Sequence, residues 1–315
     1  MSRQSTRNHW VTKRHDARTL ALLLILLPFA WLVPVRHWPG VGRLLTGLTR
    51  SRARAQVNLA RDAPGYDDAV ARTQQRRTSI FESRMQYLRE YWPGGWQVPI
   101  AVEGLGHVEA ARSRDHGVIL WVAYQDFASL VVKKGLCQTG LAVHHLSAPA
   151  HGLSSSRLGI KYLNPIVTRI EDRYLAERIP YHENRSARAV AAMQRRLRDG
   201  LVLSITAGVG RRSTVPVPVG DGDLVFPVSL GPLKLARKTG AALLPCYISR
   251  ARDRSFTVHI TPPLDLTSVE DPVAAAAIAL RELSERLSPA IAAQPELWRC
   301  RPASEDNAAA SRSDI

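Results

Sequence analysis

Three polar side chains follow an apolar run in the stretch GVILWVAYQDFAS, residues 117–129: Tyr124, Asp126 and Ser129. The run GVILWV predicts a buried strand that ends just before them. Tyrosine and aspartate are acid–base groups, and serine is a nucleophile or a hydrogen-bonding group. Because α/β proteins place their sites at the carboxyl ends of strands, the spacing predicts an active site here. The alternative is an ordinary strand-to-helix turn.

Histidines supply a second set of candidate bases. His144 and His145 lie in the next predicted strand, and His151 follows that strand. Neighbouring parallel strands lie about 4.8 Å apart, so we expect their carboxyl ends to open onto one crevice. A single histidine is more often a structural residue than a base. The residues alone therefore leave open whether Tyr124 or one of these histidines takes a proton.

A glycine-rich turn, GVGRRS at 208–213, follows another apolar run. Backbone N–H groups of such a turn and two guanidinium groups together form a cradle for an anion. The residues that would form it are Gly208, Gly210, Arg211 and Arg212. A solvated basic turn is the alternative.

Several kinds of chemistry have no support in the sequence. It contains no P-loop, no GxGxxG after a strand, no HExxH and no GxSxG. Its three cysteines are scattered without CxxC spacing, which predicts neither a metal centre nor a disulfide framework and favours a reducing compartment. We expect no metal and no bound cofactor.

Basic residues dominate the chain, most of all near its N-terminus. The formal net charge is +16, and residues 1–62 hold eleven Lys and Arg but only two acidic residues. Such an excess suits anionic lipid or a phosphorylated substrate, although an arginine-rich composition alone also produces it. Nucleic acid is not an expected partner, because no nucleic-acid-binding motif is present and aromatics are not interleaved with the basic residues.

Residues 19–35, TLALLLILLPFAWLVPV, form an uncharged apolar stretch. It is near the lower limit for crossing a bilayer core about 30 Å thick, and Pro28 and Pro34 interrupt it. Trp31 and Trp38 stand where interfacial aromatics are expected. Because both flanks are basic, a shallow re-entrant or monotopic anchor fits better than a single span, a cleaved signal peptide or a buried helix.

After about residue 96, short apolar runs alternate with helical patterns, which predicts an α/β fold with a mainly parallel central sheet covered by helices. Strands are expected at 98–104, 117–123, 140–146, 201–207, 242–248 and 256–261, and helices at 66–92, 124–135, 184–199, 230–239 and 271–289. Gly200 and Gly240 stand at predicted helix ends. The expected domains are a basic region with the anchor (1–62), the α/β domain (63–300) and a disordered tail (301–315).

Three blocks resemble one known family. GDGDLVFPVSLGPLKLARKTGAALLP (220–245) resembles the final block of the bacterial lysophospholipid and lipid A (lauroyl) acyltransferases. Residues 117–130 and 197–213 are similar to the first and third blocks, and Arg157 in SSSRLGI falls at the family's substrate-binding arginine. The resemblance covers about residues 19–290 and implies a glycerolipid-acyltransferase-like α/β domain.

The resemblance also implies a reaction and a location. It implies transfer of a fatty acyl group, from acyl carrier protein or acyl-CoA as co-substrate, to a hydroxyl or amine of a lipid-like acceptor. Membrane lipid and acyl carrier protein are the implied partners, and the implied location is the cytoplasmic side of the bacterial inner membrane. Arg157 and the turn at 208–213 would hold a phosphate of the acceptor or of the carrier. Oligomeric state is left open.

The departures from the family lie where its chemistry takes place. The family uses a histidine and an acidic residue five positions later as a charge-relay pair, and here those positions hold Tyr124 and Ser129. The acidic position of the third block holds Ala207. With an ordinary pKa of about 10, a tyrosine is rarely ionised at neutral pH.

Three interpretations follow from these departures. Tyr124 is activated by Asp126 or by an arginine, Arg157 or Arg211. Alternatively, one of the three histidines replaces it as the base. In the third interpretation the chain is a catalytically degenerate pseudoenzyme that binds lipid or acyl carrier on the same fold.

Overall fold

The computed structural model describes residues 3–47, 66–113, 117–182, 186–208, 214–220, 222, 224–267 and 269–302. The chain divides into two compact units. Met1–Val98 with Pro149–Arg173 form one, here called the helical unit, and Pro99–Ala148 with Tyr174–Ile315 form the other, the sheet unit. Gly210, Arg211, Arg212 and the predicted domain boundary at residues 62 and 63 lie outside the described residues.

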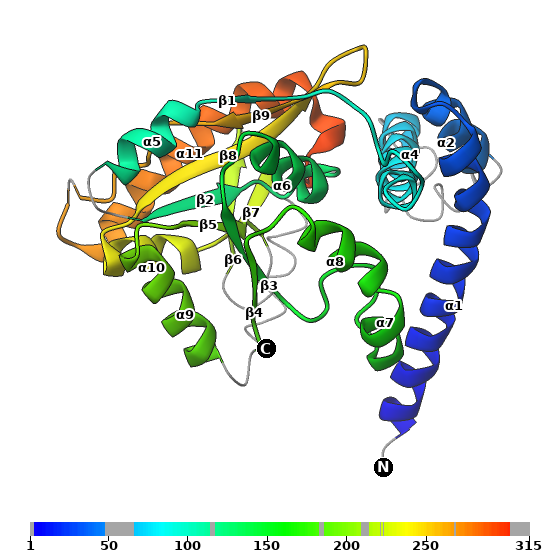
Figure 1. The fold of residues 1–315 in the computed structure, drawn as a ribbon, viewed down its shortest axis with the longest axis horizontal. Helices are drawn as coiled ribbons and strands as arrows, with labels where there is room; N and C mark the ends of the chain where they lie inside the picture. The colour runs from blue at the N-terminus through cyan, green and yellow to red at the C-terminus, as the bar shows by residue number, and fades with distance from the viewer. Residues whose placement is uncertain are drawn as a thin grey trace. The chain divides into compact units, whose positions relative to one another are not determined.

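All regular secondary structure in the described part of the helical unit is helical (Figure 1). Helices α1 and α2 both pack against α4. The elements are α1 (Arg3–Leu32), η1 (Val35–His37), α2 (Trp38–Gly47), α4 (Tyr66–Arg89), α7 (Arg157–Tyr162) and α8 (Pro165–Asp172). The predicted interruption at Pro28 does not occur, because α1 continues through it and ends before Pro34.

The two tryptophans expected at a membrane interface both bind backbone of this unit. Trp38 is buried, and its Nε1 donates to the Val33 carbonyl at 3.0 Å. Trp31 is half-buried, and its Nε1 donates to the Leu88 carbonyl at 3.0 Å. Both indole N–H groups are thus paired with backbone carbonyls of the same unit.

The sheet unit contains a seven-stranded sheet with the order β1-β9-β8-β2-β5-β3-β4. Its strands are β1 (Ile100–Glu103), β2 (Val118–Val122), β3 (Val143–Ser147), β4 (Glu177–Pro180), β5 (Val202–Thr206), β8 (Ala242–Arg250) and β9 (Phe256–Ile260). Every neighbouring pair is parallel except β8 and β9. The predicted α/β fold with a mainly parallel sheet is confirmed.

Helices flank this sheet, and a second sheet lies beside it in the same unit (Figure 1). The helices are α5 (Leu105–Arg112), α6 (Ala128–Gln138), α9 (Ser186–Arg198), α10 (Gly231–Thr239), α11 (Pro272–Ala293) and η3 (Pro295–Leu297). The three-stranded sheet has the order β10 (Arg301–Pro302), β7 (Leu224–Ser229), β6 (Thr214–Val219). All three strands of this sheet contain proline, which explains why the sequence pattern does not predict them as strands.

Strand β2 is the centre of the core. All five of its residues are buried, and β8 and β5 pair with it on either side. Full burial of side chains such as Ile119 and Leu120 contributes roughly 1.5–3 kcal/mol each. The strand is therefore a rigid support for the polar residues that follow it.

Candidate functional site

The segment after β2 is held by backbone and amide hydrogen bonds within the sheet unit. The Ala123 N–H donates to the Cys246 carbonyl at 2.7 Å. The Gln125 side chain accepts from the Ile248 N–H at 2.8 Å and donates to the Ile248 carbonyl at 2.9 Å. These bonds fix the positions of Tyr124, which is half-buried, and Asp126, which is buried.

Arg299 binds two of the predicted site residues, Tyr124 and Asp126. Its Nη1 donates to the Tyr124 hydroxyl at 2.7 Å, and its Nε and Nη2 lie 2.9 and 2.8 Å from Asp126 Oδ1. The guanidinium carbon also lies 4.5 Å from the centre of the Tyr124 ring. Burial lowers the pKa of Arg299, but the Asp126 carboxylate and Tyr124 outweigh it and raise this pKa above its usual range. Arg299 is a permanent cation that ties the C-terminal segment to the end of β2.

Ser129 has a different partner. It lies in the first turn of α6, one turn before Lys133, whose Nζ donates to the Ser129 hydroxyl at 2.8 Å. Lys133 is buried, and helix α6 begins after Phe127, which has a left-handed backbone with φ of 69°. Such a backbone is unusual for a residue with a side chain. Tyr124 and Ser129 thus follow the same strand but are bound to different basic side chains.

Gly208 brings the glycine-rich turn next to Tyr124. Its φ is +77°, and a Cβ built on it would lie 2.7 Å from the Pro227 carbonyl oxygen and 3.5 Å from the Tyr124 Cβ. The preceding Ala207 N–H donates to the Val122 carbonyl at 2.7 Å. The first and third blocks therefore meet at this point, and only glycine fits there without strain.

His144 and His145 do not lie beside the end of β2, contrary to expectation. Strand β5 is inserted between β2 and β3, and both histidines lie within β3 rather than at its carboxyl end. His145 is buried, with Nδ1 2.8 Å from the Ser204 hydroxyl of β5. The Nδ1 of His144 lies 2.9 Å from Glu177. Both fit the role of paired structural residues.

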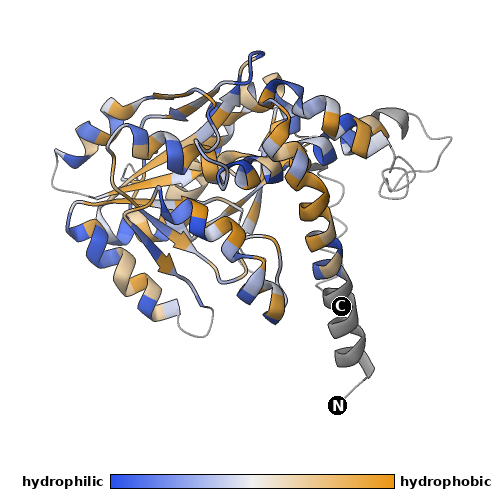
Figure 2. Ribbon diagram, turned by 45° about the vertical axis from the view of Figure 1, so that its right-hand side comes forward, coloured by the Kyte–Doolittle hydropathy of each residue, from blue (hydrophilic) through white to orange (hydrophobic). Residues whose placement is uncertain are grey.

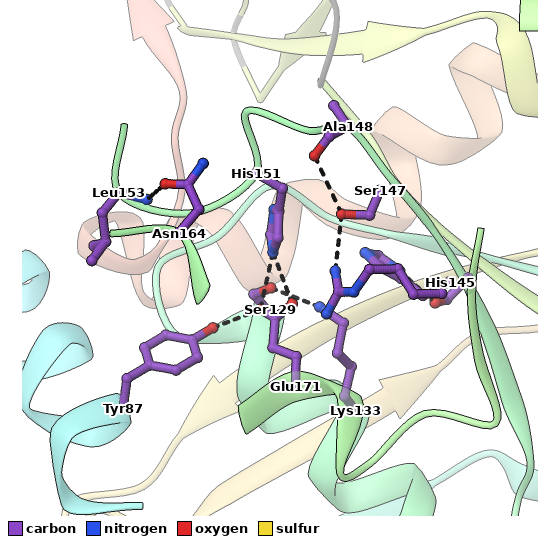
Figure 3. Close-up of polar contacts among 12 residues, drawn as sticks. Tyr87, Ser129, Lys133, His145, Ser147, Ala148, His151, Leu153, Asn164 and Glu171 are labelled. Atoms are coloured by element: carbon purple, nitrogen blue, oxygen red, sulfur yellow. Dashed lines mark hydrogen bonds and ion pairs between the residues drawn. The ribbon is translucent and has the colours of Figure 1, made fainter. Parts of the chain in front are cut away.

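His151, in the helical unit, forms a pair with a carboxylate that the sequence did not indicate. Its Nε2 lies 2.8 and 3.0 Å from the two carboxylate oxygens of Glu171 in α8. The Tyr87 hydroxyl of α4 donates to the same carboxylate at 2.8 Å. Figure 3 shows the Tyr87 and His151 side chains converging on the Glu171 carboxylate. This is the arrangement of an imidazole oriented by an acid.

Asn164 shapes the loop that carries His151. It is buried, and its Oδ1 accepts from the N–H groups of Leu153 and Ser154 at 2.8 and 2.9 Å. Its Nδ2 donates to the carbonyls of Pro149 and Ser154 at 3.2 and 2.9 Å. Arg157 begins α7 a few residues later and is exposed. Asn164 therefore defines the path of the chain from His151 towards the predicted substrate-binding arginine.

The burial of its carboxylate partner distinguishes His151 from His144 and His259, which also lie beside carboxylates. Glu177, beside His144, is 36% exposed and also binds Arg196 through both of its oxygens. Glu103, 3.0 Å from His259, is 67% exposed, and His259 also contacts Ser249 at 2.7 Å. Glu171 is 0% exposed. Of these three carboxylates, only Glu171 is fully removed from water.

The chain matches the family model of the bacterial lipid A biosynthesis acyltransferases over residues 17–299. It belongs to this family. The resemblance drawn from the three sequence blocks is thereby confirmed. A search of curated proteins found no match.

Membership in the lipid A acyltransferase family gives the site its chemical setting. The family implies a lipid acceptor and an acyl donor. Among the described residues, no group of three or more His, Cys, Asp or Glu could hold a metal ion. One described helix, through its segment His15–Leu32, is long and apolar enough to cross a membrane. That helix is consistent with membrane association in this bacterial family.

Proposed function

We propose that the chain transfers a fatty acyl group, from acyl carrier protein or acyl-CoA, to a hydroxyl or amine of a lipid acceptor, and that His151 is its general base. The observation that carries the proposal is the His151–Glu171 pair in a chain of this family. A histidine oriented by a buried carboxylate supplies the proton transfer that acyl transfer to a hydroxyl requires. The proposed location is the cytoplasmic side of the inner membrane.

The acyl transfer begins at the acceptor hydroxyl. His151 donates its Nε2–H to Glu171, and its other ring nitrogen, Nδ1, takes the proton of the acceptor hydroxyl. The acceptor oxygen attacks the thioester carbonyl carbon at the same time. The C–S bond then breaks, and the proton passes from Nδ1 to the departing thiolate. Glu171 stabilises the imidazolium between the two transfers, because a buried carboxylate attracts it with little screening.

Arginines would bind the phosphate groups of the substrates. Arg157 is exposed at the start of α7, and its guanidinium can donate two parallel hydrogen bonds to a phosphate. Gly208, Gly210, Arg211 and Arg212 are proposed for the same task on the glycine-rich turn. No cofactor beyond the acyl donor is needed for this reaction.

A second function is favoured by a separate observation. Arg299 binds both Tyr124 and Asp126, and Lys133 binds Ser129 within α6, so the two positions that the sequence analysis aligns with the family's relay pair both bind basic side chains of the chain itself. On that basis the chain would be a catalytically degenerate protein that binds lipid or acyl carrier. The two functions share the fold and differ in whether His151 transfers a proton.

The deciding experiment is lipid mass spectrometry of cells without the gene, complemented by the wild type, His151→Ala or Tyr124→Phe. We expect one acylated lipid to appear with the wild type and with Tyr124→Phe, and to be lost with His151→Ala at equal protein abundance. Loss with Tyr124→Phe alone would assign the base to Tyr124. Product from both variants would contradict a catalytic role for either residue, and no lipid change from the wild type would favour the binding function.

A further inference from the structure

Three polar side chains of the sheet unit lie on one face of its seven-stranded sheet. Figure 2 shows hydrophobic residues concentrated in the central strands of this unit. Glu103, His259 and Ser249 are polar residues on three neighbouring strands, β1, β9 and β8. Val258 and Ile248, which precede the last two in their strands, are buried and face the other side of the sheet. The three polar side chains therefore project from the face opposite to those core residues.

The register of the strands brings these side chains together. Glu103 lies directly opposite His259 in the parallel pair of β1 and β9. In the antiparallel pair of β8 and β9, Ser249 lies opposite Thr257, so it is a diagonal neighbour of His259 on the same face. Long side chains such as histidine can reach across this diagonal. Residues from distant parts of the chain thus meet on a hydrogen-bonded sheet, which is a rigid support for a site.

The imidazole of His259 binds both of the other side chains. Its Nδ1 lies 3.0 Å from the Glu103 carboxylate, and its Nε2 lies 2.7 Å from the Ser249 hydroxyl. An ionised carboxylate only accepts hydrogen bonds, so Nδ1 carries a proton and donates it to Glu103. In the neutral ring Nε2 is then an acceptor, and the Ser249 hydroxyl donates to it. Serine, imidazole and carboxylate are connected here as in a catalytic triad, with each ring nitrogen in the corresponding role.

Solvent reaches this group of side chains. The side chains of His259 and Glu103 are 24% and 67% exposed, and Ser249 is half-buried. His145 also lies beside a serine, Ser204, but both of those residues are buried. A small molecule from solution can therefore approach Ser249, whereas Ser204 is enclosed in the core.

Tyr247 holds the imidazole from a third side. It lies opposite His259 in the register of β8 and β9, and the two rings stack with their centres 4.7 Å apart and their planes at 21°. Burial raises the pKa of Tyr247, and the nearby Glu103 charge adds to the shift, so the phenol stays neutral. The stack restricts rotation of the imidazole and provides an uncharged aromatic surface for the apolar part of a substrate.

We propose that the sheet unit carries a second catalytic centre, which hydrolyses short carboxylic esters, with Ser249 as nucleophile, His259 as base and Glu103 as the residue that positions the imidazole. His259 takes the Ser249 proton while the serine oxygen attacks the ester carbonyl carbon. The bond to the alcohol oxygen breaks, and His259 returns the proton to the departing alkoxide. Water then attacks the acyl-serine with the same assistance, and the carboxylic acid leaves.

This activity is separate from the proposed acyl transfer. It uses none of the residues assigned to that reaction, so either activity can fail while the other persists. Ser249 is half-buried among side chains of its own sheet, which favours a short acyl group.

Covalent labelling tests whether Ser249 is activated. The purified full chain is treated with diisopropyl fluorophosphate, whose phosphorus forms a bond to an activated serine oxygen as fluoride leaves, and mass spectrometry locates the adduct. We expect an adduct at Ser249. His259→Gln keeps hydrogen-bonding groups beside both neighbours but cannot take the proton, so it should slow labelling at least about 100-fold.

Ser113 is the internal control for labelling. It is exposed, and its hydroxyl donates to the Ala110 carbonyl at 2.9 Å, so we expect it to stay unmodified. An unmodified Ser249, a Ser113 labelled as fast as Ser249, or an unchanged rate in His259→Gln would overturn the proposal.

Hydrolysis of p-nitrophenyl acetate tests turnover. We expect Ser249→Ala to lower kcat/KM at least about 100-fold. Glu103→Gln should lower kcat about tenfold at an unchanged KM, because this carboxylate orients the imidazole and does not touch the ester. Ser113→Ala is the matched control and should retain the wild-type rate. If the three residues only hold the strands together, Ser249→Ala and Glu103→Gln will lower the unfolding temperature and leave hydrolysis unchanged, and the proposal is then rejected.

Discussion

The His151–Glu171 pair and the Tyr124–Asp126–Arg299 cluster each contain a buried carboxylate and a tyrosine, but the two carboxylates bind different nitrogen groups. Asp126 binds the guanidinium of Arg299, which stays protonated at every pH the protein meets. Glu171 binds an imidazole and a phenol hydroxyl. Imidazole is the side-chain group that gains and loses protons near neutral pH.

This difference separates a structural cluster from a chemical one. Arg299 connects two segments that are 173 or more residues apart in the chain, and its proton is never available for transfer. His151 connects a loop to α8, and in the proposed function it transfers a proton to and from the substrates. Polar residues at the end of a strand are therefore not enough to identify a general base. A candidate base must also be a group that gains and loses a proton near neutral pH.

The largest expected effect is on acyl transfer. We expect His151→Ala to lower kcat/KM at least about 100-fold, which is about 2.7 kcal/mol in the activation barrier, because a general base typically contributes that much. Glu171→Gln keeps the shape of the carboxylate but not its charge and should lower the rate about tenfold or more. The double variant should be no slower than His151→Ala alone, since the two residues act as one unit.

Tyr124→Phe is the matched comparison for that experiment. It removes one hydrogen bond from Arg299 and leaves the ring in place, so we expect less than about a tenfold change in rate. A loss with Tyr124→Phe that equals or exceeds the loss with His151→Ala would reverse the assignment of the two regions.

The next largest effect is on folding stability at the Arg299 cluster. Arg299→Ala removes the guanidinium that binds a buried carboxylate, so we expect the free energy of unfolding to fall by roughly 2–3 kcal/mol. This lies below the value for fully buried pairs because Arg299 is partly exposed. Urea denaturation measures this free energy. Arg299→Lys keeps the positive charge but not the planar guanidinium, so it should lower the free energy of unfolding by less than Arg299→Ala does. A change below about 0.5 kcal/mol would mean that the cluster does not hold the C-terminal segment.

Much of the fold could be predicted from local patterns. Each of the six predicted strands overlaps a strand of the seven-stranded sheet. Short continuous apolar runs such as VILWV are typical of strands that are buried on both faces. Gly200 and Gly240 end α9 and α10 with φ of 69° and 71°, as predicted from glycine's freedom to adopt that conformation. Strands β6 and β7 were missed because their prolines mask the pattern.

The site was harder to predict because its partners are distant in sequence. Arg299 meets Tyr124 across 175 residues, and Tyr87 meets Glu171 across 84, so no local spacing connects them. The strand order, with β5 between β2 and β3, also placed His144 and His145 away from the predicted crevice. Lys133 is the exception, since it follows Ser129 by four residues on one predicted helix and could have been identified from that spacing.

A smaller effect tests how closely the third block packs against the final block, which contains Pro227. Gly208→Ala forces a side chain into a left-handed backbone and against the Pro227 carbonyl oxygen, 2.7 Å from the new Cβ. Gly200→Ala has a similar φ, of +69°, but no atom within 4 Å of its Cβ. We therefore expect Gly208→Ala to cost about 1–2 kcal/mol more than Gly200→Ala in thermal or urea unfolding. Equal costs would show that the two blocks are not in tight contact.

The smallest effect concerns Glu177, an exposed counterpart of Glu171. The Arg196 hydrogen bond is the main reason that the pKa of Glu177 lies below its ordinary value of 4.5; partial burial opposes the shift and His144 adds to it. A carboxyl whose pKa is lower in the folded state stabilises the fold above its ordinary pKa. That contribution is lost as the pH falls through the folded value.

Arg196→Gln should therefore lower the free energy of unfolding only slightly near pH 7, because water screens this ion pair at the surface. The difference from the wild type should shrink as the pH falls below the ordinary carboxyl pKa and vanish once the pH lies below the lowered folded-state pKa of Glu177, where the group is protonated in both states. Urea unfolding across this range measures it. A loss of stability that persists unchanged in acid would come from lost packing of the Arg196 methylene groups. The Arg196–Glu177 pair could then not serve as an electrostatic reference for the His151–Glu171 pair.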